Sequence, residues 1–187
     1  MNSKIIIAGS GGQGVLLLGK LIAYAAMLSG RYVTWFPSYG AEMRGGTANC
    51  TVVISDEDIG SPVVKTPDIL VVFNCPSFER FIPRLKRGGQ VFYDSSLVSA
   101  RICSNGRFEE NLRNFQVVSV NATTEAVSLG SARFTNMVMF GAFIKKSGLM
   151  NHVNTGDLLR KVLPKRHHSH IEKNLEAIER GIGSIEN

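Results

Sequence analysis

Cysteine is scarce in this sequence, and its scarcity excludes one class of metal centre. Only Cys50, Cys75 and Cys103 occur, far apart and in no C-x-x-C pair. An iron–sulfur cluster needs about four closely organised thiolates, so this chain alone cannot supply the ligands of one. The spacing is typical of a protein from a reducing cytoplasm, and we expect three small, buried thiols.

Long hydrophobic runs and dense surface charge are also missing. No apolar stretch approaches the roughly 18 residues of a membrane-spanning helix, and the N-terminus shows no signal-peptide pattern. Charged residues make up 19% of the 187 residues, against about 25% in typical globular domains. This favours a single soluble domain, and low charge is a modest sign of an obligate protein partner.

The remaining charge is positive, and it gathers in one place. The net formal charge is +6, and the segment KRHHSH at 165–170 holds much of the local excess. Contact with an acidic or phosphorylated partner is one interpretation, and a solvated basic face is the simpler one. No aromatic residues alternate with these charges, so we expect no nucleic-acid binding. The histidine spacing offers no metal geometry, so we expect no metal site.

Hydrophobic periodicity predicts alternating strands and helices. Residues 4–8, 13–29 and 32–36 predict a strand, a helix and a second strand, which form a βαβ unit. Further strands are expected at 47–55, 68–74, 90–94 and 115–120. Helices are expected at 76–89 (capped by Ser77), at 124–147 (interrupted near Gly130), at 155–163, and from a capping box at Ser169–Glu172 to Gly181. The pattern predicts an α/β fold: a doubly wound, mainly parallel sheet with flanking helices and a helical C-terminal part.

The first strand leads into a glycine turn, GSGGQG, in which Gly9, Gly11 and Gly14 fit the pattern G-x-G-x-x-G. In dinucleotide-binding proteins these glycines permit a tight turn, close approach of a pyrophosphate, and close packing of helix on strand. The acidic residue expected about 20 positions later, which holds a ribose hydroxyl, is absent from the second strand and its end, TWFPSYG. An independent NAD or FAD enzyme is therefore a minor alternative. Anion contact at the helix start, close approach of another protein, or a plain tight turn all remain open.

A second glycine-rich segment, PSYGAEMRGGTANC at 37–50, follows the second expected strand. Loops at the carboxyl ends of adjacent parallel strands converge, so we expect the two segments to be neighbours. Arginine and tyrosine are enriched in interface hot spots, so the predicted surface fits a docking face better than a catalytic pocket, and we nominate no catalytic residue. The candidate cofactor-binding or subunit-interface residues are Gly9, Gly11, Gly12, Gln13, Gly14, Tyr39, Gly40, Glu42, Met43, Arg44, Gly45 and Gly46.

Together these segments resemble a known family. GSGGQGVLLLGKLIAYAA, followed by VTWFPSYGAEMRGGTANCTVVIS, is similar to the gamma subunit of 2-oxoacid:ferredoxin (or other acceptor) oxidoreductases. The resemblance continues through SPVVKTPDILVVFN and LKRGGQVFYDSSL to RFTNMVMFGAFIKKSG. The form YGAEMRGGTA is most similar to the 2-oxoglutarate type. The resemblance implies that residues 1–187 form a single gamma-type domain, with its helical part at about 123–183.

The resemblance also implies a reaction and a set of partners. The family's complexes oxidatively decarboxylate a 2-oxoacid with coenzyme A, here 2-oxoglutarate to succinyl-CoA and CO2, and reduce ferredoxin or flavodoxin. Thiamine diphosphate, Mg2+ and iron–sulfur clusters are implied for the complex and not for this chain alone. Alpha, beta and delta subunits are the implied partners in a cytoplasmic complex of anaerobic metabolism. An isolated chain is expected to be inactive and able to form a homodimer through its docking face.

Several functional alternatives stay open on the residues alone. Within the family, branched-chain 2-oxoacid, pyruvate and indolepyruvate oxidoreductases are the near rivals. Outside it, a free-standing Rossmann-like nucleotide-binding protein remains possible because of the glycine turn, and a regulatory or nucleic-acid-binding module is suggested only by the basic charge.

Overall fold

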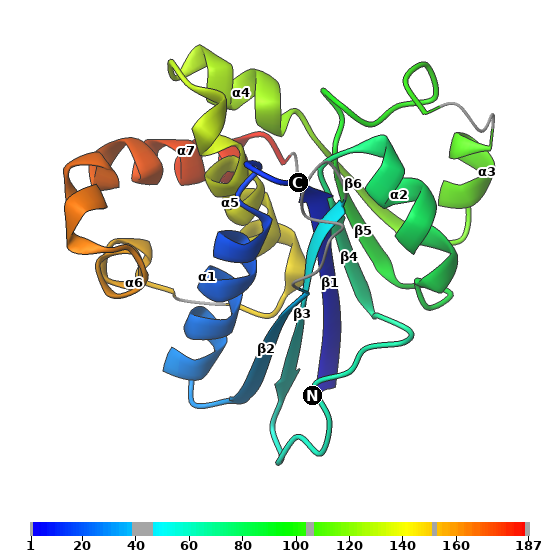
Figure 1. The fold of residues 1–187 in the computed structure, drawn as a ribbon, viewed down its shortest axis with the longest axis horizontal. Coiled ribbons are helices and arrows are strands. Elements are labelled where there is room, and N and C mark those ends of the chain that lie inside the picture. Colours follow the sequence, from blue (N-terminus) through cyan, green and yellow to red (C-terminus); the bar gives the residue numbers. More distant parts are fainter. Residues whose placement is uncertain (1, 39–46, 104–106, 151–152, 186–187) are drawn as a thin grey trace.

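A six-stranded mixed sheet forms the centre of the molecule (Figure 1). The computed structural model describes residues 2–38, 47–103, 107–150 and 153–185. The strand order is β2-β3-β1-β4-β5-β6, and the four strands β1, β4, β5 and β6 run parallel. The strands are β1 (Asn2–Ser10), β2 (Tyr32–Ser38), β3 (Thr47–Ser55), β4 (Ile69–Val72), β5 (Gln90–Asp94) and β6 (Gln116–Val120).

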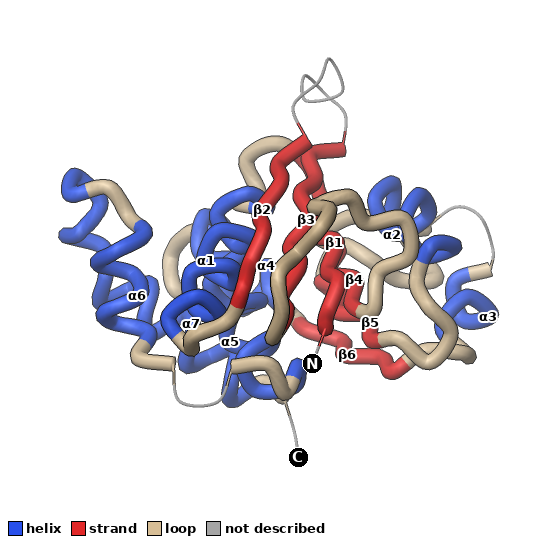
Figure 2. The backbone as a smooth tube through the Cα atoms, turned by 90° about the horizontal axis from the view of Figure 1, so that it is seen from below, coloured by secondary structure: helices blue, strands red, loops and turns tan. Residues whose placement is uncertain are grey.

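Helices cover both faces of this sheet, as Figure 2 shows. Alternation along β1 sets the two layers, because Ile5 and Ile7 join one hydrophobic core while Ile6 and Ala8 join the other. The first core packs under α1 (Val15–Leu28), α4 (Ala122–Ser128), α5 (Thr135–Ser147), α6 (Thr155–Val162) and α7 (Ile171–Gly183). The second packs under α2 (Cys75–Phe81) and α3 (Phe108–Leu112). The doubly wound α/β class is therefore confirmed.

The predicted pairing of the first two strands is wrong. β3 lies between β1 and β2 and runs antiparallel to both, with Ser10 opposite Thr47 and Ser38 opposite Asn49. A strand, a helix and a strand predict a parallel neighbour only if no later strand enters between them, and the order of strands is a tertiary property. β2 is instead one of the two edge strands, and its exposed Tyr32 and Phe36 reflect that position.

The helix expected at 76–89 is shorter and begins earlier than predicted. Asn74, and not Ser77, is its N-cap: the Asn74 side-chain oxygen accepts a hydrogen bond from the Ser77 amide at 2.9 Å. α2 ends at Phe81, and a 3-10 turn (Ile82–Arg84) that contains Pro83 follows it. Proline lacks an amide hydrogen and cannot continue the helical ladder, which explains the early end.

The helical C-terminal part is confirmed in outline, with two local corrections. The predicted break near Gly130 separates α4 from α5, with a 3-10 turn (Ala132–Phe134) between them. The capping box at Ser169–Glu172 does not form, because a 3-10 turn (Lys165–His170) leads into α7 and no side chain caps it. Gly181 does not end α7, which reaches Gly183.

Gly181 of α7 and Gly141 of α5 instead allow the two helices to pack closely. A Cβ atom on Gly181 would collide with the backbone oxygen of Val138, and one on Gly141 with the backbone oxygen of Ile178. The two helices thus cross with their backbones in contact. Glycine is required at both positions by the neighbouring helix and not by the local backbone conformation.

The expectation of three free cysteines is also wrong. Cys75 and Cys103 form a disulfide between the start of α2 and the loop after β5. They are 28 positions apart in the chain, and only the fold brings them together. Cys50 is free and buried, as expected.

Candidate functional site

The glycine turn lies where the topology of the sheet changes direction. The chain leaves β1 toward α1 on one face and leaves the adjacent β4 toward α2 on the other face. In open α/β sheets the loops after two such strands diverge and leave a crevice, where ligands commonly bind. The candidate site is therefore the junction between the ends of β1 and β4, where this rule expects the crevice.

Gln13 bridges this crevice from inside the turn. Its side-chain oxygen accepts a hydrogen bond from the Ser10 amide at 2.6 Å, and its side-chain nitrogen donates to the Phe73 carbonyl at 3.2 Å. Asn74 adds a second link, because its side-chain nitrogen donates to the Ser10 hydroxyl at 2.6 Å. These bonds hold the ends of β1 and β4 in one arrangement, so the turn is preorganised before any ligand or partner arrives.

The glycines of the turn have separate physical roles. A Cβ on Gly9 would lie 2.7 Å from the Gln13 side-chain oxygen and 3.0 Å from the Phe73 Cβ, so this residue must be small. Gly12 and Gly14 have φ angles of 92° and 73°, in the left-handed region that side chains rarely adopt. A Cβ on Gly12 would meet no atom of the described residues within 4 Å, so none of those residues crowds this position.

Gly14 faces the chain itself and not an open surface. A Cβ on Gly14 would collide with the side chain of Asn136, the second residue of α5. The Asn136 side-chain nitrogen donates to the Gly14 carbonyl at 3.4 Å. The third glycine of the motif therefore lets α1 and α5 meet, and substitution there would disturb the fold before it disturbed any partner.

The second glycine-rich segment lies only partly within the described residues. Tyr39, Gly40, Glu42, Met43, Arg44, Gly45 and Gly46 all fall outside them. Ser38 and Thr47, on either side of this segment, are paired with Asn49 and Ser10 at the edge that carries the glycine turn. The prediction that the two segments form one surface stays a prediction, although the strand pairing places both ends of the second segment at that edge.

The strand order also counts against the dinucleotide geometry. In the dinucleotide fold the acidic residue that holds the ribose ends the strand next to the first one. Here the neighbours of β1 are β3, which runs the opposite way, and β4. Asn74, and no carboxylate, directly follows the residues at the end of β4. The glycine turn therefore lacks the partner that nicotinamide dinucleotides use.

A polar cluster at the ends of β5 and β6 is structural. Asp94 is fully buried, and its carboxylate accepts hydrogen bonds from the Thr123 hydroxyl at 2.5 Å and the Ser96 amide at 3.1 Å. Ser95 and Ser96 bond to Asn121 and Thr124. All these groups are satisfied by one another, so the cluster fixes α4 against the sheet and leaves no free reactive group.

Cysteine, histidine and carboxylate side chains form no second candidate site in the described residues. Burial raises the pKa of the Cys50 thiol to about 12, against a weaker opposing hydrogen bond from Trp35, so the thiol stays protonated at neutral pH. No group of three or more potential metal-ligating side chains occurs in the part of the chain that is described. Within the same residues no helix is long and apolar enough to cross a membrane.

The sequence analysis nominated Gln13 and the glycines, and it did not nominate Ser10, Phe73 and Asn74, which the structure places beside them. Asn74 follows a buried strand, which is a usable signal, although only the position of β4 beside β1 makes it relevant. The sequence also missed Asn136, which is remote from the turn in the chain and in contact with it in the fold.

Comparison with known proteins gives consistent matches. Residues 4–184 match the family described as pyruvate ferredoxin/flavodoxin oxidoreductase. The 2-oxoglutarate synthase subunit KorC of Methanothermobacter marburgensis is 35% identical over 182 residues, which cover 97% of this chain and 95% of KorC. The ketoisovalerate oxidoreductase subunit VorA of the same organism is 43% identical over 141 residues, or 75% of this chain.

Some of these relatives are much longer than this chain. The match spans only 28% of VorA. A solved structure of the 2-oxoglutarate:ferredoxin oxidoreductase from Magnetococcus marinus, with 2-oxoglutarate, coenzyme A and succinyl-CoA bound, superimposes with a TM-score of 0.78 at 26% identity. It matches 97% of this chain but 30% of its own. This chain thus corresponds to one part of larger polypeptides in these proteins.

Proposed function

The chain belongs to the pyruvate ferredoxin/flavodoxin oxidoreductase family, and on that premise we propose that it is the gamma subunit of a cytoplasmic 2-oxoglutarate:ferredoxin oxidoreductase. The complex would convert 2-oxoglutarate and coenzyme A into succinyl-CoA and CO2, and would pass two electrons to ferredoxin or flavodoxin. One observation carries this proposal: the similarity to KorC runs over nearly the whole of both chains.

A branched-chain 2-oxoacid oxidoreductase is the second candidate. VorA has the higher identity, 43%, although over fewer residues and over little of its own length. The side chain of the 2-oxoacid would be read mainly by partner subunits, so similarity of this chain alone weighs the two substrates only indirectly.

We place the redox cofactors on the partner subunits. Of the three cysteines in the sequence, Cys75 and Cys103 are bonded to each other and Cys50 is buried, so they do not fit an iron–sulfur cluster. Thiamine diphosphate, bound elsewhere in the complex, would supply the carbanion chemistry. We assign residues 1–187 to one gamma-type domain, which shapes the assembly around those centres.

The glycine turn and the segment at 39–46 form the proposed working face of this subunit. Gly12 leaves room for the backbone of a partner or for coenzyme A, and Gln13 holds the turn rigid. Arg44, within this segment, is the candidate residue for contact with an anionic group, since coenzyme A carries several phosphate charges. The alpha and beta subunits, with or without a delta subunit, would dock here.

The test is affinity purification of this chain from its own cells under anaerobic conditions. We expect partner subunits to co-purify, and the eluate to reduce viologen with 2-oxoglutarate in a coenzyme A-dependent reaction. The same assay with 2-oxoisovalerate, pyruvate and indolepyruvate distinguishes the rivals. A chain that purifies alone, without any 2-oxoacid-dependent activity, would contradict the proposal.

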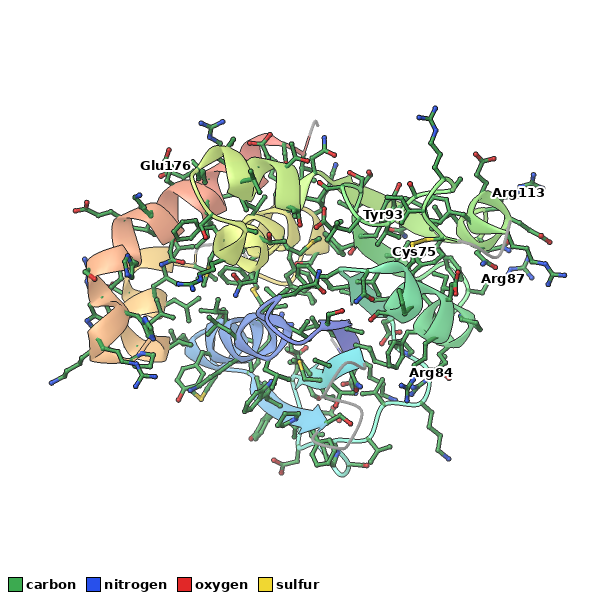
Figure 3. All side chains as sticks on the ribbon, turned by 45° about the horizontal axis from the view of Figure 1, so that its top comes forward. Cys75, Arg84, Arg87, Tyr93, Arg113 and Glu176 are labelled. Atoms are coloured by element: carbon green, nitrogen blue, oxygen red, sulfur yellow. A yellow bond between two sulfur atoms is a disulfide. The ribbon has the colours of Figure 1, made fainter. Side chains whose placement is uncertain are left out.

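A substitution in the assembled complex tests the assignment of Arg44. Arg44→Ala is expected to raise the KM for coenzyme A about tenfold or more, the loss of one charge-assisted contact, with little change in the KM for the 2-oxoacid. Arg113→Ala is the matched control, because Arg113 is an exposed arginine at the end of α3, far from α7 (Figure 3). Equal coenzyme A constants for both variants would remove Arg44 from the site.

A further inference from the structure

A second hollow lies on the helical side of the sheet, where α1, α5 and α7 begin. It has a volume of about 490 Å3 and opens beside the glycine turn, with Gly14 in its wall. It is separate from the crevice between β1 and β4, because α1 leaves the turn toward the opposite face from α2. No proposed role of the gamma subunit depends on it.

Its lining divides into an apolar floor and a basic rim. Leu17, Phe134, Met137 and Leu163 supply buried or half-buried apolar surface. The charged or titratable side chains that line it are all basic and exposed: Arg133, His167, His170 and Lys173. No aspartate or glutamate is among the described lining residues, although Glu172 is adjacent to Lys173 in the first turn of α7.

A buried polar atom in the wall lacks a partner. Asn136 is 3% exposed, and its side-chain oxygen accepts no hydrogen bond from the described residues, while its nitrogen donates to Gly14. Burial of an acceptor without a donor is unfavourable. The oxygen itself has almost no solvent-accessible surface, so it marks a tightly packed wall and not a contact point for a ligand.

The helix starts add positive potential at the same place. α1 begins at Gly14, with no side-chain cap and no acidic residue in its first turn. α5 also begins at this wall, without a side-chain cap and without an acidic residue in its first turn, whereas α7 carries Glu172 in its first turn. Helix N-termini carry a partial positive charge, which favours phosphate.

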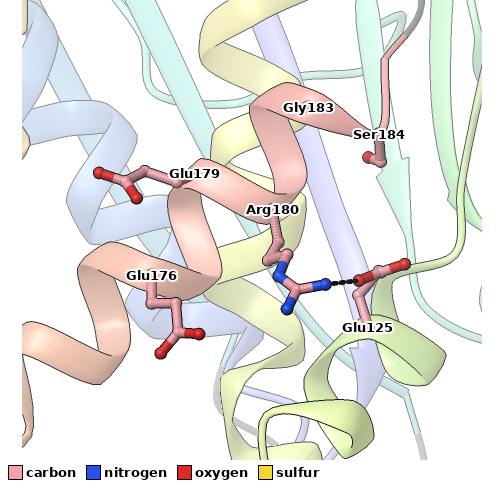
Figure 4. A pocket seen from close by; sticks show the side chains of 6 residues that line it. All are labelled: Glu125, Glu176, Glu179, Arg180, Gly183 and Ser184. Carbon is pink, nitrogen blue, oxygen red and sulfur yellow. Dashed lines mark ion pairs between the residues drawn. The ribbon is translucent and has the colours of Figure 1, made fainter.

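The other large hollow of the molecule has the opposite character. It lies between α4 and α7 and is lined by Glu125, Glu176, Glu179 and Arg180, with Gly183 and Ser184 (Figure 4). Glu125 pairs with Arg180 at 3.5 Å, which leaves two glutamates to repel an anion. The basic character is therefore a property of the hollow where α1, α5 and α7 begin and not of the helical face as a whole.

We propose that the hollow between α1, α5 and α7 binds a nucleoside phosphate. The apolar floor would hold the base, and the basic rim would hold the phosphate. A free mononucleotide and the nucleotide end of coenzyme A share this chemistry. Only the second source rests on the proposed function.

Binding of a fluorescent ADP analogue, with a methylanthraniloyl group on the ribose, tests the proposal on the purified full chain. We expect saturable binding that unlabelled ADP displaces and that Lys173→Glu and Arg133→Ala each weaken at least tenfold. Lys173→Glu places a negative charge in the first turn of α7, where it stabilises a helix. The melting temperature of the variant should therefore be unchanged or higher. Arg113→Ala is the control and should bind as the parent chain does.

Competition then separates the two sources. Displacement by coenzyme A but not by pantetheine or AMP would assign the site to the nucleotide end of coenzyme A, and displacement by AMP and ADP but not by coenzyme A would assign it to a free nucleotide. No binding by the parent chain, or equal binding by the rim variants, would overturn the proposal. So would loss of binding in the assembled complex, since a partner subunit would then fill the hollow. The binding measurement needs no catalytic turnover, so its result is independent of the 2-oxoglutarate assay.

Discussion

At the scale of single residues, similar glycines in one motif carry different constraints. Gly9 is small because Gln13 and Phe73 lie against it, and Gly14 because Asn136 does. Among the described residues, Gly12 is constrained by its backbone angle and not by a neighbour, because an added Cβ would meet none of them within 4 Å. Gly12 is therefore the position at which a role in approach by another molecule can be isolated.

Gly12→Ala should reduce recovery of the assembled complex, or weaken its binding of coenzyme A. The effect should be larger than the loss of unfolding free energy explains. Gly30→Ala is a matched control, because Gly30 has a φ angle of 79° and lies at the far end of α1, where an added Cβ would meet no described atom within 4 Å. Each variant should lose roughly 1–2 kcal/mol of unfolding free energy from the left-handed backbone. Urea unfolding and co-purification measured on both variants give the comparison. If both lose the complex equally, the turn has no special role in assembly.

At the scale of elements, α5 and α7 cross with their backbones in close contact. Gly141 and Gly181 bring the two backbones together. The helical part therefore packs on the sheet as a unit, and the walls of the nucleotide hollow, which come from α1, α5 and α7, are held by it.

Gly181→Ala should destabilise the protein, although alanine favours an isolated helix. The new methyl group would collide with the Val138 oxygen, so we expect a loss of about 1–3 kcal/mol or more in unfolding free energy. Gly183→Ala, two residues later in the same helix, has open space and should be neutral or gain up to about 1 kcal/mol. Thermal and urea unfolding of the pair measure the difference. Equal stability of the two variants would show that the crossing is looser than described.

At the scale of the whole molecule, the thiols report global unfolding. Burial raises the pKa of Cys50 from 9.0 to about 12, and the other two cysteines are bonded. The folded chain should therefore not react with Ellman's reagent at pH 8 without reductant, and the urea-unfolded chain should show the one free thiol of Cys50. Three reactive thiols after unfolding would mean that Cys75 and Cys103 are not joined in solution.

The same pKa gives a sign for the pH dependence of stability. The folded pKa of Cys50 lies above the unfolded value, so its neutral thiol contributes fully below about pH 9. That contribution is lost as the pH rises toward 12. Cys50→Ala should flatten this part of the curve of unfolding free energy against pH, and an unchanged slope would assign the loss to other groups.

The sequence by itself determined the α/β class, the approximate position of each strand and the glycine turn, because these depend on local periodicity and on residues that punctuate the chain. The bounds of β3 and β5 were predicted to the residue, whereas α2 was not, because Asn74 and Pro83 act on its ends through local contacts that periodicity does not report. Only the tertiary structure decided the strand order, with β3 between β1 and β2, and hence that the turn faces β4. It also decided the Cys75–Cys103 bond, the meeting of Gly14 with Asn136, and the basic hollow. Each of these features joins residues that are far apart in the chain. Packing of whole helices and strands brings them together, and no local sequence pattern encodes that packing.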